Sequence, residues 1–209
     1  MKKLGSLLVI AIMFLAPAIA FAGLTEGLDY TTLSPPQPTA AGGRIEVAEF
    51  FWYGCPHCYD FEPTLNKWRK TLPKDVVFRR IPALFPSGRW TPAVRLFYAL
   101  EAIGAEDRVH GALFDAIHVA NMDYTDPATV TDWLVKQGVD RKKFTAAYNS
   151  AEVQAQIRRA QELTKAYGIT GVPTMVVGGR YLTSNTLAGS FEALPAILDQ
   201  LIAKLRAAP

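Results

Sequence analysis

The sequence predicts an α/β fold in which a long helical stretch separates two groups of strands. Three observations predict it. A strand, a helix and a second strand follow one another in residues 45–81, which is the order of a βαβ unit. Residues 93–167 show helical periodicity and no strand pattern. Residues 172–205 have the pattern of a strand hairpin followed by a closing helix.

The N-terminus has the pattern of a secretory signal peptide. Lys2 and Lys3 precede an apolar run over residues 7–14, and Ala20 and Ala22 are the small residues expected before a cleavage site. The apolar run is short for a membrane span. Removing 22 of the 209 residues leaves 187 and lowers the formal charge from +3 to +1. This near-neutral balance argues against a nucleic-acid-binding protein.

The first predicted strand covers residues 45–51, after a proline-rich lead-in over residues 23–43 that is expected to hold at most a short strand. Both faces of this strand are largely apolar, as expected of a central strand that is covered on both sides. Glu49 interrupts the pattern. It is either an exposed residue near the strand end or a buried acid that helps to move protons at the cysteines, in which case burial raises its pKa.

The helix that follows the first strand begins at Pro56, because proline is favoured at the first helical position. Its apolar residues are spaced at helical intervals, and it is expected to end near Pro73. Cys55 is therefore at the helix N-terminus and Cys58 is in the first turn, close enough to form a disulfide with little backbone movement. These are the only two cysteines of the chain.

A helix N-terminus carries partial positive charge and unpaired N–H groups, so a thiol there loses its proton more readily than usual. His57 can add positive charge or a hydrogen bond to the Cys55 sulfur. A stabilised Cys55 thiolate favours the reduced protein and makes the disulfide a stronger oxidant. We therefore expect a redox-active pair in which Cys55 is exposed and Cys58 is shielded.

Two other interpretations of the cysteines stay open. A structural disulfide across so short a loop stabilises a fold by only ~2 kcal/mol. A metal site would use Cys55, His57 and Cys58, but these lie on one turn, and zinc usually takes four ligands. A c-type haem site needs histidine directly after the second cysteine, where this chain has tyrosine. His110 and His118 are interpreted as ordinary surface or packing residues.

The remaining elements follow from periodicity and from turn residues. A strand parallel to the first is expected over residues 76–81. Helices are expected over residues 93–103, 107–118, from 127 onward, 140–148 and 150–167, then strands over 172–177 and 180–183 and a helix over 191–205. Because proline cannot donate to a strand ladder, Pro173 belongs at a strand start. We expect the Val172–Pro173 bond to be cis.

Residues 50–58 read Phe-Phe-Trp-Tyr-Gly-Cys-Pro-His-Cys and closely resemble the DsbA family of bacterial periplasmic thiol oxidases. Together with the signal-peptide pattern, the helical stretch and Gly-Val-Pro-Thr at 171–174, the resemblance covers essentially the whole chain after residue 22. It implies a thioredoxin-like fold with an inserted α-helical domain. The implied division is a signal peptide at 1–22, a thioredoxin-like domain at 23–84 and 154–209, and the inserted domain at 85–153.

The resemblance also implies a function. Cys55 would be the nucleophilic cysteine of a disulfide oxidase that acts on newly exported, unfolded proteins through a mixed disulfide, and Cys58 would be its buried partner. Pro56 and His57 complete the catalytic motif, and Glu49 matches the buried acid of the family. That acid is often paired with a lysine in the family, whereas this chain has Arg79 and Arg80 nearby, and arginine does not deprotonate.

By the same resemblance, Pro173 faces the disulfide and Val172 offers backbone contacts to a bound peptide. Trp52, Tyr53, Leu84 and Phe85 either line an apolar groove for substrates or pack in the core. The resemblance implies no cofactor, no metal, a periplasmic monomer, and reoxidation by a quinone-linked membrane protein of DsbB type. A disulfide isomerase or reductase and a metal-binding chaperone are the alternative functions.

Overall fold

A computed structural model describes residues 23–207, which fold around a five-stranded sheet with the strand order β1-β5-β4-β2-β3. The strands are β1 Thr31–Thr32, β2 Ile45–Phe51, β3 Val76–Pro82, β4 Thr174–Val177 and β5 Tyr181–Ser184. β2 and β3 are parallel, and the other neighbouring strands are antiparallel. The thioredoxin-like fold class is confirmed. The predicted signal peptide lies outside the described residues.

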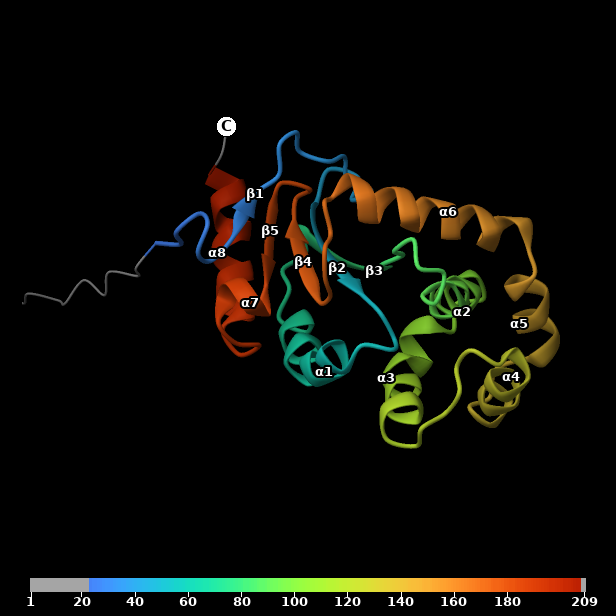
Figure 1. Ribbon diagram of the computed structural model, residues 1–209. Coiled ribbons are helices and arrows are strands. Elements are labelled where there is room, and N and C mark those ends of the chain that lie inside the picture. The colour runs from blue at the N-terminus through green and yellow to red at the C-terminus, as the bar shows by residue number, and fades with distance from the viewer. Residues whose placement is uncertain (1–22, 208–209) are drawn as a thin grey trace, which may run out of the picture.

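Eight helices occur in residues 23–207, and five of them are consecutive between β3 and β4. The helices are α1 Pro56–Arg69, α2 Thr91–Ala102, α3 Glu106–His118, α4 Pro127–Lys136, α5 Arg141–Tyr148, α6 Ala151–Ala166, α7 Asn185–Ala188 and α8 Leu194–Ala207. Helices α2 to α5 gather beside the sheet, and α6 runs back from them to it (Figure 1). None of the helices in the described part of the chain is long and apolar enough to cross a membrane.

β2 is the central strand predicted from its apolar pattern, and helices cover both of its faces. On one face, Val47 packs in a cluster with residues of α1 and α8. On the other face, Ala48 and Phe50 pack with Leu163 of α6 and with Tyr167 just after it. Side chains alternate between the faces of a strand, so this double cover explains the nearly continuous apolar run. The end of β2 delivers the chain to the two cysteines.

Two predicted boundaries differ from the structure. The first helix starts at Pro56 as expected but ends at Arg69 rather than near Pro73, because a turn follows in which the Thr71 hydroxyl donates to the Trp68 carbonyl. The strand expected from residue 172 begins only at Thr174. The other predicted helices and strands lie within a few residues of their ranges, and the short helix α7 was not predicted.

Candidate active site

Cys55 is the N-cap residue of α1, with extended backbone angles of φ −96° and ψ 115°. Its carbonyl accepts from the N–H groups of Cys58 and Tyr59, both at 3.1 Å. Its own N–H donates to the Trp52 carbonyl at 2.9 Å, which holds the turn between β2 and α1. Pro56 is at the first helical position, where the backbone N–H that proline lacks would have no acceptor within the helix. The Cys55 side chain thus lies at the positive end of the α1 dipole.

Both cysteines are free thiols in the structure, and both are buried. Cys58 is fully buried, which confirms the predicted shielding. Cys55 is only 8% exposed, so the prediction of an exposed Cys55 is wrong. The reason is the loop before β4, which packs against it: the Cys55 Sγ lies 3.5 Å from the carbonyl oxygen of Val172. A reacting sulfur must therefore approach beside this loop.

The two thiols are held in opposite protonation states. A hydrogen bond from the Cys58 side chain, hydrogen bonds from the N–H groups of Cys58 and His57, and the charge of His57 lower the pKa of Cys55 to about 6, although burial acts in the other direction. Burial raises the pKa of Cys58 well above its ordinary value, and the nearby sulfur of Cys55 adds to this. At neutral pH the pair therefore holds one thiolate, on Cys55, and one thiol, on Cys58.

A groove of about 450 Å³ lies beside the cysteines, and its lining includes His57, Val172 and Pro173. The Val172–Pro173 bond is cis, as expected. His57 is exposed, and residues 185–187 of α7 also line the groove. The groove is open to a peptide that approaches Cys55 along the loop before β4.

None of the four residues considered for an apolar substrate groove, Trp52, Tyr53, Leu84 and Phe85, lines the groove beside Pro173. Tyr53 is fully buried and Leu84 is 7% exposed, so both belong to the core. Trp52 does not line the groove beside Pro173; its ring packs on Trp90 with the centroids 4.1 Å apart. Phe85, half-buried, packs edge-on against the same Trp90. A tryptophan pair, rather than a groove, is what these residues form.

Glu49 is a buried acid, with 1% exposure, so the interpretation as an exposed strand-end residue is wrong. Its Oε2 has no hydrogen-bond partner and lies 3.5 Å from Nε of Arg80, in the paired position of β3. Burial and the negative charge of Glu62 raise the pKa of Glu49 to about 7, despite the opposing charge of Arg80. Glu49 can therefore take up or release a proton near neutral pH.

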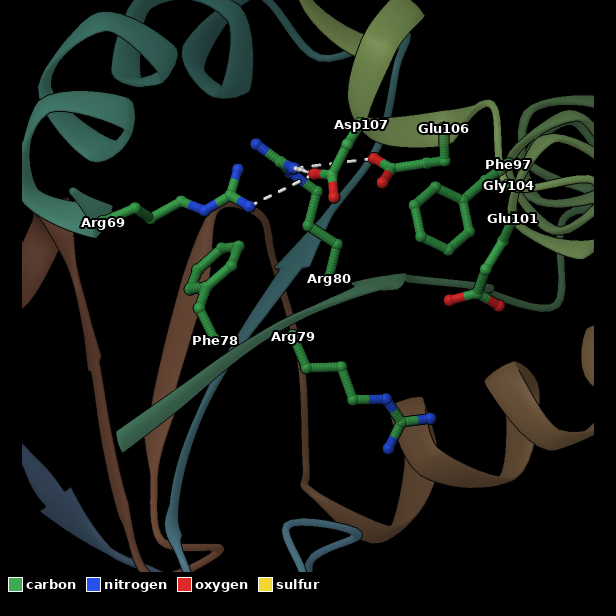
Figure 2. A pocket seen from close by; sticks show the side chains of 9 residues that line it. All are labelled: Arg69, Phe78, Arg79, Arg80, Phe97, Glu101, Gly104, Glu106 and Asp107. Carbon is green, nitrogen blue, oxygen red and sulfur yellow. Dashed lines mark hydrogen bonds and ion pairs between the residues drawn. The ribbon is translucent and has the colours of Figure 1, made fainter. Parts of the chain in front are cut away.

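Arg80 divides its charge among several carboxylates, two of which, Glu106 and Asp107, line a small pocket with it (Figure 2). Its guanidinium group donates to Glu62 at 3.3 and 3.4 Å and lies 3.5 Å from Glu106 and 3.6 Å from Asp107. The pocket has a volume of about 280 Å³ and opens beside Asp107, whose side chain is 80% exposed. Arg80 thus donates hydrogen bonds to Glu62, whereas Glu49 Oε2 lies 3.5 Å from its Nε without a hydrogen bond.

Sequence reasoning assigned no role to the other members of this cluster, which are Glu62, Glu106, Asp107 and His110. His110 is 2% exposed and contacts Glu62 and Glu106, so its interpretation as an ordinary surface or packing residue is wrong. His118 does pack, half-buried, with its ring stacked on Tyr59. The available signal was spacing, because Glu62 follows Cys58 by one helical turn and His110 lies one turn before Phe114, each on a buried face. Across residues 23–207, no three His, Cys, Asp or Glu side chains are arranged to hold a metal ion.

Comparisons with known proteins give a consistent match. A family model described as "DSBA-like thioredoxin domain" matches residues 46–194. The chain is 47% identical over 184 residues to the thiol:disulfide interchange protein DsbA of Pseudomonas aeruginosa, covering 88% of this chain and 87% of that one. It is 44% identical over 193 residues to DsbA of Azotobacter vinelandii, covering 92% and 90%.

Solved structures of DsbA proteins are also similar to this chain. The crystal structure of Pseudomonas aeruginosa DsbA matches with a TM-score of 0.84 and 46% identity, over 88% of this chain and 95% of that one. The oxidoreductase DsbA from Xylella fastidiosa matches with a TM-score of 0.82 and 33% identity, over 88% and 99%. The likeness therefore extends over both the sheet and the inserted helices.

Proposed function

The chain belongs to the DsbA family and is a protein thiol:disulfide oxidoreductase, and on that basis we propose that it oxidises newly exported, unfolded proteins in the periplasm. Its Cys55–Cys58 disulfide would be the donor. The observation that carries this direction is the opposite protonation of the two thiols, with the pKa of Cys55 at about 6 and that of Cys58 raised by burial. A pair that rests as a thiolate is a poor reductant, so its disulfide readily accepts electrons.

The exchange consists of two displacements. A substrate thiolate attacks the Cys55 sulfur of the disulfide, and Cys58 leaves as a thiolate, which gives a mixed disulfide on Cys55. A second substrate thiolate then attacks the substrate sulfur of that mixed disulfide, and Cys55 leaves as a thiolate. Two electrons pass from the substrate dithiol to the pair, and the substrate gains one disulfide. A low pKa of the leaving thiol speeds the second displacement.

Glu49 is proposed as the proton donor for Cys58. The thiolate that leaves in the first displacement is fully buried, where an uncompensated charge is costly. A protonated Glu49 can transfer its proton to the Cys58 sulfur and become a carboxylate, and it regains a proton when the pair is reoxidised. Its pKa of about 7 suits both directions at neutral pH.

Val172 and Pro173 are proposed to hold the substrate backbone. Pro173 lines the groove beside the cysteines and has no N–H of its own, while the carbonyl of Val172 lies 3.5 Å from Sγ of Cys55. An extended peptide could pair with this backbone as an added strand does. His57 lines the same groove, and Trp52, which packs on Trp90 outside the groove lining, is proposed as an apolar flank for the peptide.

The partners follow from the same chemistry. Each turnover leaves the pair reduced, so a second protein must remove two electrons; we propose a quinone-linked inner-membrane protein of DsbB type. Neither displacement needs a cofactor, a metal ion or nucleic acid. We propose that the protein works as a monomer, because a complete pair of thiols, the acid Glu49 and the substrate loop all lie in one chain.

Trapping of mixed disulfides tests this assignment. In the variant Cys58→Ser, an adduct on Cys55 cannot be resolved from within the protein, so disulfide-linked complexes with a reduced, unfolded substrate should accumulate on a non-reducing gel. Cys55→Ser is the matched control and should form none, since Cys58 is buried and protonated. Adducts on Cys55→Ser but not on Cys58→Ser would reverse the roles of the two cysteines.

A further inference from the structure

The proposed exchange leaves His110 without a role, although His110 lies at the centre of the buried charges. Its Nε2 lies 3.2 Å from Oε1 of Glu62, and its Nδ1 lies 2.9 Å from Oε1 of Glu106. The Nδ1 atom is also 2.8 Å from the hydroxyl oxygen of Tyr53. A neutral imidazole could donate from Nε2 to Glu62 and accept from the Tyr53 hydroxyl at Nδ1, but its Nδ1 lone pair would then face the Glu106 carboxylate at 2.9 Å. An imidazolium presents an N–H to the carboxylate on each side and removes that repulsion. The geometry therefore fits the charged form.

Counted over its largely buried members, the cluster is neutral with that form. Three carboxyl groups, on Glu49, Glu62 and Glu106, are largely buried near a single buried arginine, Arg80. If Glu62 and Glu106 are ionised, Arg80 offsets one of the two negative charges. An imidazolium at His110 offsets the other, and the cluster is then neutral with the proton on Glu49. An unbalanced buried charge would be strongly unfavourable.

We propose that His110 is held as an imidazolium and is the counter-cation that keeps Glu49, rather than Glu62 or Glu106, as the buried carboxyl that exchanges a proton with the cysteine pair. His110 is thus a positioning residue: it touches neither cysteine and acts through the carboxylates around Arg80. This inference rests on the proposed function, because it assigns a supporting residue to the proton donor of the first displacement.

Groups from each element packed against His110 support the charged form. Glu62 faces it from α1, Arg80 from β3, Tyr53 from the turn after β2, and Glu106 from one turn earlier on α3. Burial and the charge of Arg80 act against a charged imidazole, but hydrogen bonds to Glu106 and Glu62 and the charge of Glu62 outweigh them and raise the pKa of His110.

The pKa values of Glu62 and Glu49 are consistent with a positively charged His110. Although burial opposes its ionisation, the hydrogen bond to His110 and the charges of His110 and Arg80 lower the pKa of Glu62 to about 2. The negative charge of Glu62 in turn is one cause of the raised pKa of Glu49. Glu49 is therefore the acid that titrates near neutral pH, and its Oε2 is a buried oxygen without a hydrogen-bond partner.

The first experiment uses the unmodified protein. Nitrogen-15 spectra of the histidine side chains of the reduced protein, recorded from pH 5 to pH 9, report whether each ring nitrogen carries a proton. We expect both nitrogens of His110 to be protonated at pH 7. One unprotonated nitrogen at pH 7 would overturn the proposal, and this result needs no variant and no oxidase activity.

The second experiment removes the charge. In His110→Gln the side chain can still donate to one carboxylate, but it carries no charge. The charge of His110 lowers the pKa of Glu49, and Glu62 keeps its contacts with Arg80 and Asn66. We therefore expect the titration of the Glu49 carboxyl carbon, followed by carbon-13 spectra, to move up by about one pH unit, at the low end of shifts that a nearby full charge causes.

His118→Gln is the matched control. His118 is on the same helix and bonds to the same residue, but it contacts the Tyr53 carbonyl at 2.8 Å and no carboxylate. The Glu49 titration should stay in place in this variant. Equal shifts in the two variants, or no shift in His110→Gln, would overturn the proposal. Since both titrations are measured on the resting protein, they stand apart from any failure to oxidise substrates.

Discussion

Reducing the Cys55–Cys58 disulfide should change the stability of the fold in a way that depends on pH. Only the reduced protein has a Cys55 thiol that can ionise, and its pKa is about 6 in the folded state. In the unfolded chain the value is ~8.5. Because folding lowers this pKa, the thiolate stabilises the fold fully above pH ~8.5, and the contribution is lost as pH falls through about 6.

The size of the effect follows from these two pKa values. Linkage gives a contribution to the free energy of unfolding of ~0 kcal/mol at pH 5, ~1.4 at pH 7 and ~3 at pH 9. These are upper limits, since water near the helix start screens part of the interaction. Against them stands the loop closure that favours the oxidised form, ~2 kcal/mol for so short a loop. The reduced form should therefore become the more stable one slightly above neutral pH.

Urea melts of the oxidised and reduced proteins at pH 5, 7 and 9 test this balance. We expect the oxidised form to be more stable at pH 5 and the reduced form at pH 9. Cys55→Ser, kept reduced, is the control, because it reports how pH affects the rest of the fold without the thiolate. A difference between the two forms that does not change between pH 5 and pH 9 would refute the reasoning and leave the pair as a structural disulfide.

Three further substitutions probe the groups around the sulfurs. His57→Leu removes a charge that helps to hold the pKa of Cys55 low. Equilibration with glutathione should show a less oxidising pair, by 30 mV for each ~1.4 kcal/mol of thiolate stabilisation that is lost. An unchanged reduction potential would contradict a role for His57. Pro173→Thr places an N–H in the substrate groove, so mixed disulfides should live longer in a quench assay; equal lifetimes would exclude Pro173 from substrate release. Glu49→Gln should stabilise the fold above pH 7 by on the order of 2 kcal/mol. The reason is that the raised pKa of the Glu49 carboxyl lowers the stability of the unmodified protein as pH rises from about 4.5 to about 7. Equal urea midpoints for the variant and the unmodified protein at pH 8 would contradict this.

Much of the fold follows from local pattern. The apolar faces of β2 predict a central strand, and Pro56 marks the start of α1 because its missing N–H suits a helix start. The caps of the inserted helices are equally local, since the side chains of Asp126 and Ser150 accept from N–H groups of the next turn. These signals need only a few neighbouring residues, which is why the element order could be predicted.

The site was predictable only where it depends on neighbours in sequence. The helix start predicts an acidic Cys55, but the loop that covers Cys55 comes from Val172, 117 residues further along the chain. His110 lies 48 residues from Glu62. No spacing within either helix says that these two faces meet. A polar residue on an apolar helix face is the only trace that such a contact leaves in the sequence.

The register of β2 against β3 decides which arginine lies beside the buried acid Glu49. In this register Glu49 lies opposite Arg80, and Ala48 lies opposite Arg79. Adjacent residues of a strand point to opposite faces, so a slip of one residue would exchange the two arginines. Arg79, on the other face, lies 4.0 Å from Glu46. Arginine keeps its charge at any working pH, so the proton that moves in this cluster must be carried by a carboxyl or an imidazole. The register therefore supports the proposal that Glu49 passes a proton to the cysteines, and His110 is the second titrating group that we propose to act on Glu49.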